Sequence, residues 1–436
     1  MKREMEPALL LLVATRSYRT QDFLAAAERL GVPVVLGTDL CHQVEEAFGV
    51  RTDQVSIDFR RPERAAERIA AVAADRPIRG IIPTDEGTAV IAAFAAKRLG
   101  IPHNSPESAR RAANKHAQRA ALAAQGVPVP PFSLHAIADG PERAALRVAY
   151  PCVLKPIGLS ASRGVIRADD ATSFMAAWRR IERILSDARA ERRPRDEEAA
   201  RSILVEGFVP GAEIAVEGLL RGGRLEVLAL FDKPDPLDGP FFEETIYVTP
   251  SRHPPQLQER AIRTVAEGAA ALGLVEGPLH AELRLAPGGP VVLEIAARSI
   301  GGLCARTLRF GAGVSLEEIL VAHALGLPVA TLDRDRRAAG VMMLPIPRAG
   351  ILRGVAGVEQ ARAVAGVEDV VITIPEGREV EPLPEGDAYL GFAFARGERP
   401  EEVEQALRAA HAQLRIDIRP ALPTVGAAPS HRAHSP

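Results

Sequence analysis

Two strand-like segments joined by a short turn constrain the fold of this chain more than any other feature of its sequence. Residues 279–298 read LHAELRLAPGGPVVLEIAAR, with apolar side chains alternating on both sides of the APGGP segment at 286–290. Pro and Gly in that segment indicate a β-hairpin with a five-residue connection centred on Gly288. This register predicts three facing pairs: Glu282 with Glu294, His280 with Ala296, and Arg284 with Val292.

The first of these pairs, Glu282 and Glu294, also predicts a ligand. Like charges directly opposite each other destabilise a β-ladder, so two facing carboxylates imply a positive charge between them. Arg298 falls on the same face of the hairpin. A divalent cation is the simplest candidate for the charge that the two glutamates share.

The overall composition favours a protein that handles small ligands in a reducing compartment. A formal net charge of −2 over 436 residues provides no broad basic field for nucleic acid or anionic membranes. The three cysteines, Cys41, Cys152 and Cys304, are far apart and lack metal-ligand spacing, which argues against a disulfide framework. The apolar run at 8–14 is too short for a signal peptide or a membrane span. We expect a cytoplasmic protein without nucleic-acid or membrane partners.

The N-terminal third alternates strand-like and helix-like segments. The apolar segments ALLLLVAT, VPVVLGTD and RGIIPTDE alternate with the helical patterns QDFLAAAERLG and TAVIAAFAAKRLG. This order predicts a doubly wound parallel sheet. Ligands of such sheets bind beyond the carboxyl ends of the strands, which singles out residues 15–17 and 84–86. No GxGxxG motif follows the first strand, so a dinucleotide site is not favoured.

The middle of the chain contains helix-like segments, and capping residues mark the ends of the first one. SPESARRAANKHAQRAALAAQG predicts one helix that is capped near Ser105 or Ser108 and ends at Gly126. A second, amphipathic helix is predicted over SFMAAWRRIERILSDARA. The charged segment at 191–201 is interpreted as a solvated insertion without chemistry.

Lysine is rare in this chain, and three of its five lysines lie in segments that suggest a site. Lys115 follows Asn114 in the predicted helix, Lys155 ends an apolar strand, and Lys233 lies in LFDKPDPLDGPFFEET. The loop GLSASRG follows Lys155, and its small residues let backbone amides approach phosphates closely. A plain β-turn is the alternative for this loop.

A further strand ends in an acidic residue. ILVEGFVPGAE carries Glu206 at the end of an apolar strand and Glu213 after a Pro-Gly turn. Such a strand exit can offer a carboxylate and main-chain groups to an adenine edge, with the second carboxylate near ribose hydroxyls. A surface hairpin with two solvated glutamates is the alternative.

Taken in order, these segments resemble the ATP-grasp superfamily. The order NK, VLKP, VEGFVPGAE, then HAE with EIAAR extends over about 105–330, roughly half of the chain, and the ordered combination is what makes the resemblance specific. The resemblance implies that ATP is held between two α+β lobes and that the carboxylates of the late hairpin bind Mg²⁺, with Mn²⁺ as an alternative.

The resemblance also assigns individual residues. Lys115 and Lys155 match lysines that contact nucleotide phosphates, with Ser160, Ser162 and Gly164 in the loop over them; Glu206 and Val209 match the adenine hinge and Glu213 the ribose contact. Glu282 and Glu294 match the magnesium ligands, Arg298 the arginine that steadies the reacting carboxyl group, and Lys233 a lysine on a loop facing the active site.

One position departs from the pattern: Ala296 stands where many members have a metal-facing Asn. The segments EIAAR, RSIGG and GPFFEET look more like the L-amino-acid ligase branch, which tolerates that alanine, than like biotin carboxylases. In that branch Glu86 and His280 match residues that meet the amino-acid substrate, and Gly301 and Gly302 the site of its carboxylate. For His280, a hydrogen-bonded core histidine is the alternative.

We therefore predict an α/β and α+β multidomain protein with an N-terminal doubly wound sheet, a two-lobed ATP-grasp core and a C-terminal α/β domain. The expected boundaries are 1–105, 106–335 with a small lobe at 115–206 and a large lobe at 207–335, 336–420, and a disordered tail at 421–436. The implied function is ATP-dependent ligation of an amino acid or carboxylate to an amine through an acyl phosphate, in a protein that can form homodimers. A biotin-carboxylase-like enzyme, a purine-pathway ligase and a non-catalytic ATP-binding protein are the alternatives.

Overall fold

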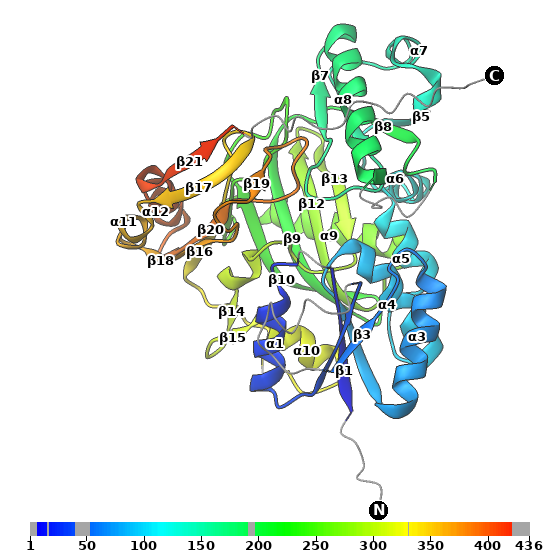
Figure 1. Cartoon of the computed structure of the whole chain (residues 1–436), viewed down its shortest axis with the longest axis vertical. Coiled ribbons are helices and arrows are strands. Elements are labelled where there is room, and N and C mark those ends of the chain that lie inside the picture. The colour runs from blue at the N-terminus through cyan, green and yellow to red at the C-terminus, as the bar shows by residue number, and fades with distance from the viewer. Residues whose placement is uncertain (1–6, 15–16, 40–52, 191–196, 330, 421–436) are drawn as a thin grey trace, which may run out of the picture.

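The structure is a computed structural model that describes residues 7–14, 17–39, 53–190, 197–329 and 331–420. Figure 1 shows a long central sheet, with a smaller sheet and helix α8 at the top and the N-terminal sheet at the bottom. The segment at 421–436, predicted to be a disordered tail, lies outside the described residues, as do Thr15, Arg16 and Cys41.

The N-terminal part is a parallel sheet with the strand order β3-β2-β1-β4. Alternate side chains of β1 serve two cores: Leu9 and Leu11 pack on the side of Phe23, and Leu10 and Leu12 pack on the opposite side. Helices therefore cover both faces, and the predicted doubly wound sheet is confirmed. Its elements are β1 (Ala8–Val13), α1 (Thr20–Arg29), β2 (Val34–Thr38), β3 (Asp53–Ser56), α3 (Pro62–Asp75), β4 (Ile78–Pro83) and α4 (Glu86–Leu99).

A small antiparallel sheet, with the strand order β5-β8-β6-β7, follows in the chain. The long helix α8 buries Phe174 and Trp178 against it, so the amphipathic pattern seen in the sequence marks the helix that covers this sheet. The elements of this part are β5 (Phe132–Ala136), α7 (Pro141–Ala145), β6 (Cys152–Pro156), β7 (Ile166–Ala168), α8 (Ala171–Ala190) and β8 (Ser202–Gly207).

The central sheet has eight strands in the order β13-β12-β9-β10-β11-β16-β20-β18. Its strands are β9 (Ala212–Arg221), β10 (Arg224–Lys233), β11 (Ile246–Thr249), β12 (Gly277–Ala286), β13 (Gly289–Ala296), β16 (Ala338–Leu344), β18 (Val367–Ile372) and β20 (Gly391–Gly397). Strand β16 pairs with β11, so the sheet continues across the domain boundary expected near 336. The separate C-terminal domain therefore stays a prediction.

The remaining elements connect these sheets or cover them. Helix α9 packs Val265 and Ala269 against the apolar face of β12 and β13, and α12 packs Val403 and Leu407 against β16 and β20. The helices and strands of this remaining group are α5 (Pro106–Ala113), α6 (Lys115–Ala124), α9 (Pro255–Leu272), β14 (Arg309–Phe310), β15 (Val314–Ser315), α10 (Leu316–Ala324), β17 (Gly350–Ala356), α11 (Val358–Arg362), β19 (Glu379–Val380), α12 (Pro400–Gln413) and β21 (Arg415–Arg419).

The hairpin of β12 and β13 has the predicted glutamate pair but a different turn. Glu282 faces Glu294 and His280 faces Ala296, as expected. The connection has two residues rather than five, and Arg284 faces Val291 rather than Val292. A β-bulge next to Glu282 absorbs the extra residue and restores the predicted register beyond it.

Two further expectations can be compared with the described residues. Cys152 and Cys304 are buried and unpaired, as small apolar side chains would be. Within the described ranges, none of the helices combines the length and apolar character that a membrane crossing requires.

Candidate active site

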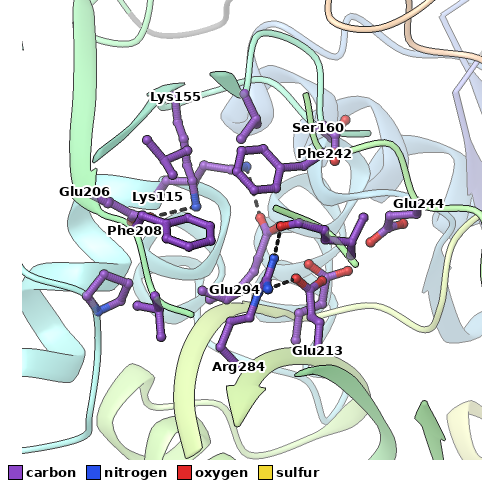
Figure 2. Close-up of a pocket in the computed structure, with 18 of the residues that line it drawn as sticks. Lys115, Lys155, Ser160, Glu206, Phe208, Glu213, Phe242, Glu244, Arg284 and Glu294 are labelled. Atoms are coloured by element: carbon purple, nitrogen blue, oxygen red, sulfur yellow. Dashed lines mark hydrogen bonds and ion pairs between the residues drawn. The ribbon is translucent and has the colours of Figure 1, made fainter. Parts of the chain in front are cut away.

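A pocket lies where the small sheet faces the end of the central sheet (Figure 2). Its space, including the part open to solvent, is about 770 Å³. Residues that the sequence analysis placed in four separate segments line it together: Lys115, Lys155, Ser160, Ser162, Glu206, Val209, Glu213, Glu282 and Glu294.

Lys115 reaches the pocket because the chain breaks a helix just before it. One helix was predicted from Ser105 to Gly126; instead, α5 ends at Ala113 and α6 begins at Lys115. Asn114 between them has extended backbone angles, and its side chain accepts a hydrogen bond from the amide of Ala117, which makes it the N-cap of α6. The prediction missed this break because Asn114 is polar within an otherwise helical pattern.

The Lys115 ammonium is held by two acceptors. Its Nζ donates to the carbonyl oxygen of Leu159 at 2.8 Å and to Oε1 of Glu294 at 3.0 Å. Leu159 belongs to the small-residue loop and Glu294 to β13, so the lysine links the two sides of the pocket. A phosphate placed here would meet this ammonium directly.

Lys155, at the pocket end of β6, pairs with Glu206. Its Nζ lies 2.6 Å from Oε2 of Glu206, whose other oxygen lies 2.6 Å from Nε of Arg119. Burial alone would raise the pKa of Glu206, but Arg119 and Lys155 outweigh it and hold that pKa below its ordinary value. The carboxylate is thus shared by two cations, so an adenine contact at Glu206 would come from its main chain.

The loop after Lys155 has the left-handed backbone that small residues favour. Ala161 and Ser162 have φ of 56° and 55°, and Gly164 has φ of 75°. A Cβ at Gly164 would approach Cγ of Pro156 to 2.6 Å, so only glycine fits there. Ser160 and Ser162 line the pocket, whereas Gly164 lies behind the loop and donates its amide to the carbonyl of Pro384.

Glu282 and Glu294 both line the pocket, as the hairpin register predicted. Their surroundings differ, because Glu294 pairs with Lys115 whereas Glu282 pairs with Lys233 at 3.0 Å. Both side chains keep partial access to solvent. Ala296 faces His280 on the same hairpin and supplies no oxygen ligand.

Lys233 lies among three carboxylates rather than on a loop. It is the last residue of β10, and its Nζ lies 2.6 Å from Glu213, 2.5 Å from Glu244 and 3.0 Å from Glu282. Burial lowers the pKa of this lysine less than the three carboxylates raise it, so the pKa stays well above its ordinary value. Burial raises the pKa of Glu244 to about 7, against the opposing pull of Lys233.

Glu244 and Arg284 were not singled out as site residues from the sequence. Glu244 is the second glutamate of GPFFEET, a segment noted only for its likeness to relatives. Arg284 lines the pocket and its Nε lies 3.0 Å from Glu213, so Glu213 is held by two cations. A ribose contact at Glu213 stays a prediction. Phe208 and Phe242 add aromatic surface (Figure 2).

The residues predicted to meet the amino-acid substrate form a second cluster, outside the lining of this pocket. Arg298 donates from Nε to Oε1 of Glu86 at 2.7 Å, which joins the end of β13 to the start of α4. Burial opposes the charge on Arg298, but Glu86 and the hairpin glutamates Glu294 and Glu282 outweigh it and raise its pKa further. The pair therefore offers one anion and one cation in a shielded place.

His280 belongs to this second cluster through Glu217, which the sequence analysis did not single out. Nδ1 of His280 lies 3.0 Å from Oε2 of Glu217, and Nε2 lies 3.6 Å from Oε1 of Glu282. Burial lowers the pKa of His280, but the bonds to Glu217 and Glu282 outweigh it and raise it to about 9. The histidine is buried and bonded to Glu217, and a contact of His280 with the substrate stays a prediction.

Gly301 and Gly302 follow in the chain. The amide of Ile300 just before them donates to both oxygens of Glu217, at 3.1 and 3.0 Å. A Cβ added at Gly301 would meet no atom within 4 Å, whereas one at Gly302 would contact the ring of Phe392 at 2.8 Å. Space beside Gly301 is compatible with a ligand there, and the contact itself stays a prediction.

The pocket carries the donor set that a hard divalent cation prefers. Glu213, Glu244 and Glu282 each offer an oxygen within 4.8 Å of the others, and Glu294 lies across the ladder from Glu282. Carboxylate oxygens suit Mg²⁺, which is bound through one or two carboxylates together with substrate phosphates. Lys233 already lies among Glu213, Glu244 and Glu282, and metal binding by Glu282 and Glu294 stays a prediction.

Three models of known protein families match segments of the chain. An ATP-grasp domain matches residues 148–307, an ATP-grasp N-terminal domain matches 24–103, and an L-amino acid ligase C-terminal domain 2 matches 342–419. The chain belongs to the ATP-grasp superfamily, as its motifs indicated. Its C-terminal segment matches the C-terminal domain 2 of L-amino acid ligases, the branch that the sequence motifs resemble.

The chain is also similar to individual proteins and to a solved structure. The crystal structure of an L-amino acid ligase from Bacillus licheniformis has a TM-score of 0.76 over 96% of this chain and 100% of that one; at 24% identity it shows the fold alone. Uncharacterized protein y4rH of Sinorhizobium fredii is 26% identical over 86% of this chain and 76% of its own length. Human carnosine synthase 1 is 29% identical over 66% of this chain, which spans 36% of that protein.

Proposed function

We propose that the protein is an ATP-dependent ligase that joins the carboxylate of one substrate to the amine of another, with an amino acid among its substrates. The observation that carries the proposal is the convergence of Lys115, Lys155, Glu282 and Glu294 on one pocket, with Arg298 at the end of the same hairpin. The likeness to an L-amino acid ligase and to carnosine synthases supports this reaction class.

The reaction has two steps. The γ-phosphoryl group of ATP is transferred to a carboxylate oxygen of the first substrate, which gives an acyl phosphate and ADP. The amine nitrogen of the second substrate then attacks the acyl carbon, the bond from that carbon to the phosphate oxygen breaks, and the nitrogen loses a proton. The products are an amide, ADP and phosphate.

The side chains of the pocket supply charge and position rather than a nucleophile. Lys115 and Lys155 are ammonium groups that would lie beside the phosphate oxygens, and Ser160 and Ser162 of the loop line the same pocket. The amides of Arg163 and Gly164 already donate to Ser160 and Pro384, so they are not counted among the phosphate contacts. Glu282 and Glu294 would hold Mg²⁺, which when bound offsets the charge that develops on the transferred phosphoryl group.

The second cluster suits a substrate that carries both a negative and a positive charge, as an amino acid does. Glu86 and Arg298 are paired with each other in the structure. In the proposed complex, the carboxylate of an amino acid lies at Arg298 and its ammonium at Glu86, so one salt bridge is exchanged for two. Arg298 then also stabilises the oxyanion formed when the amine attacks.

Trapping the acyl phosphate tests this function. The protein is incubated with ATP, Mg²⁺ and single amino acids or small carboxylates in the presence of hydroxylamine, which converts an acyl phosphate to a hydroxamate. We expect a hydroxamate with at least one carboxylate, and its loss when ATP is omitted. Phosphate release that depends on bicarbonate and biotin, without any hydroxamate, would contradict the proposal. A strict requirement for glycine and phosphoribosylamine would instead identify the purine-pathway alternative.

A further inference from the structure

Strand β13, which carries Glu294, is one of the two edge strands of the central sheet. Its inner edge pairs with β12, so the peptide groups of its outer edge need other partners. The amide of Val292 finds one in the carbonyl of Pro128 at 2.9 Å. The peptide groups on either side of Glu294 form hydrogen bonds with two side chains of α6.

Gln118 binds the peptide groups of Ile295 as a neighbouring strand would. Its Nε2 donates to the carbonyl of Ile295 at 2.9 Å, and its Oε1 accepts from the amide of Ile295, also at 2.9 Å. A further bond runs from Nε2 to the carbonyl of Ala112, at the end of α5. The side chain is 1% exposed, so all of these bonds are shielded from water.

Arg119 binds the carbonyl of Leu293, on the other side of Glu294, through one terminal nitrogen. Its Nε forms the ion pair with Glu206 at 2.6 Å, and that carboxylate holds Lys155. Arg119 is also 1% exposed. One arginine therefore contacts both the edge strand of the central sheet and the acid that fixes a lysine of the small sheet.

The helix that carries these two residues begins with Lys115. Lys115, Gln118 and Arg119 project from two adjacent turns of α6, so their relative positions are fixed by the helix. Gln118 and Arg119 bind the peptide groups that flank Glu294, and Lys115 binds the Glu294 carboxylate itself.

We infer that Gln118 and Arg119 are positioning residues that set the distance of Glu294 and Lys155 from Lys115. Neither is proposed to touch a substrate. The inference rests on the proposed function in one respect: Glu294, Lys155 and Lys115 are the groups proposed to hold Mg²⁺ and the nucleotide phosphates. Loss of a group that orients a metal ligand lowers metal affinity by roughly 10- to 100-fold in other proteins.

Gln118→Met tests this inference, because methionine fills a similar volume and makes neither bond to Ile295. We expect the Mg²⁺ concentration for half-maximal binding of a non-hydrolysable ATP analogue to rise about 10-fold or more. Amide exchange at Ile295 should accelerate, and KM for the amino-acid substrates should stay close to that of the wild type. Arg119→Lys keeps the positive charge but loses the guanidinium group, whose separate nitrogens reach both Leu293 and Glu206. This variant should also raise the Mg²⁺ concentration that half-maximal analogue binding requires.

Two variants elsewhere in the chain serve as controls. Gln258 also donates to two backbone carbonyls, of His253 and Ser251, and Arg396 also combines carboxylate partners with a backbone carbonyl. Gln258→Met and Arg396→Lys should lower the unfolding temperature and leave the Mg²⁺ requirement unchanged.

The inference is overturned if Gln118→Met and Arg119→Lys lose only thermal stability, as the controls do, while analogue binding keeps the Mg²⁺ requirement of the wild type. Failure of the proposed function looks different. In that case the wild-type protein itself binds the analogue without any Mg²⁺ effect or forms no hydroxamate, and faster exchange at Ile295 in Gln118→Met still supports the bonds inferred for the edge strand.

Discussion

Lys155 and Arg119 share the carboxylate of Glu206 in a place that is almost closed to water. Three buried charges are stable there only as a set, because removing one leaves another uncompensated. The same dependence recurs around Lys233, whose three carboxylates come from β9, the segment after β10, and β12. Single charge changes in this pocket therefore have large effects on folding as well as on binding.

Glu206→Gln should destabilise the protein by about 3–5 kcal/mol at pH 7, since Lys155 and Arg119 then lose their shared anion. The pKa of Glu206 is held below its ordinary value, so its stabilising effect is present above about pH 4.5 and is lost as the pH falls below that value. Denaturant unfolding at pH 7 and below pH 4.5 measures this. A difference between wild type and variant that does not shrink in acid would contradict the assigned charges.

Glu294→Gln should reduce turnover by about 100-fold or more, on the scale of losing one charge-stabilising group in an active site. Nucleotide binding should be partly retained, because Lys155 and the loop after it are untouched. Steady-state kinetics and analogue binding separate the two effects. Glu226→Gln, a half-buried carboxylate outside the pocket that pairs with Arg221 and Arg224, is the control. A fully active Glu294→Gln would refute the metal assignment.

At the scale of elements, the break between α5 and α6 decides where Lys115 points. A continuous helix would rotate each residue by a fixed angle from the one before, whereas the extended backbone of Asn114 lets α6 take a new direction. Asn114 stabilises this break by capping α6.

Asn114→Ala removes the cap and favours a continuous helix, so it should lower both stability, by about 1 kcal/mol, and nucleotide affinity. Ser105→Ala removes the corresponding cap of α5, because the Ser105 side chain accepts a hydrogen bond from the amide of Ser108. It should cost similar stability and leave nucleotide affinity as it is. Thermal unfolding and analogue titration of both variants make the comparison; equal affinities would contradict a role for the break.

The elements differ in how far the sequence predicts them. Glu282 faces Glu294 as predicted from a turn centred on Gly288, because the β-bulge offsets the shorter turn that the structure has. The two-residue turn and the bulge were missed, since a bulge leaves no clear mark in a sequence rich in Val and Leu. Lys233 and Glu244 come together only through pairing of β10 with β9 and the path of the following loop, which no local pattern encodes.

At the scale of the whole molecule, the C-terminal part reaches back to the small sheet. Glu385 accepts a hydrogen bond from Arg180 of α8 at 2.7 Å, and the neighbouring carbonyl of Pro384 accepts from the amide of Gly164. Gly164 ends the loop that forms one side of the pocket. The C-terminal part thus restrains the loop proposed to lie over the phosphates.

Glu385→Gln should therefore loosen that loop more than it destabilises the fold. Both side chains of the pair are about one-third exposed, and such pairs contribute about 0.2–1 kcal/mol. We expect faster hydrogen exchange at the Gly164 amide with little change in unfolding temperature. Glu142→Gln breaks another α8 pair, with Arg179, that does not involve the C-terminal part; equal exchange at Gly164 in both variants would contradict the restraint.

The central claim is that one pocket couples ATP cleavage to amide formation, and a screen of ADP release over amino acids and small carboxylates, singly and in pairs, tests it most directly. Mass spectrometry of each reaction identifies the product. We predict ADP release that requires Mg²⁺ and a substrate pair and is matched by an equal amount of an amide. ADP release that stays at background across the whole panel, while the analogue still binds, would contradict the ligase account and favour a non-catalytic ATP-binding protein.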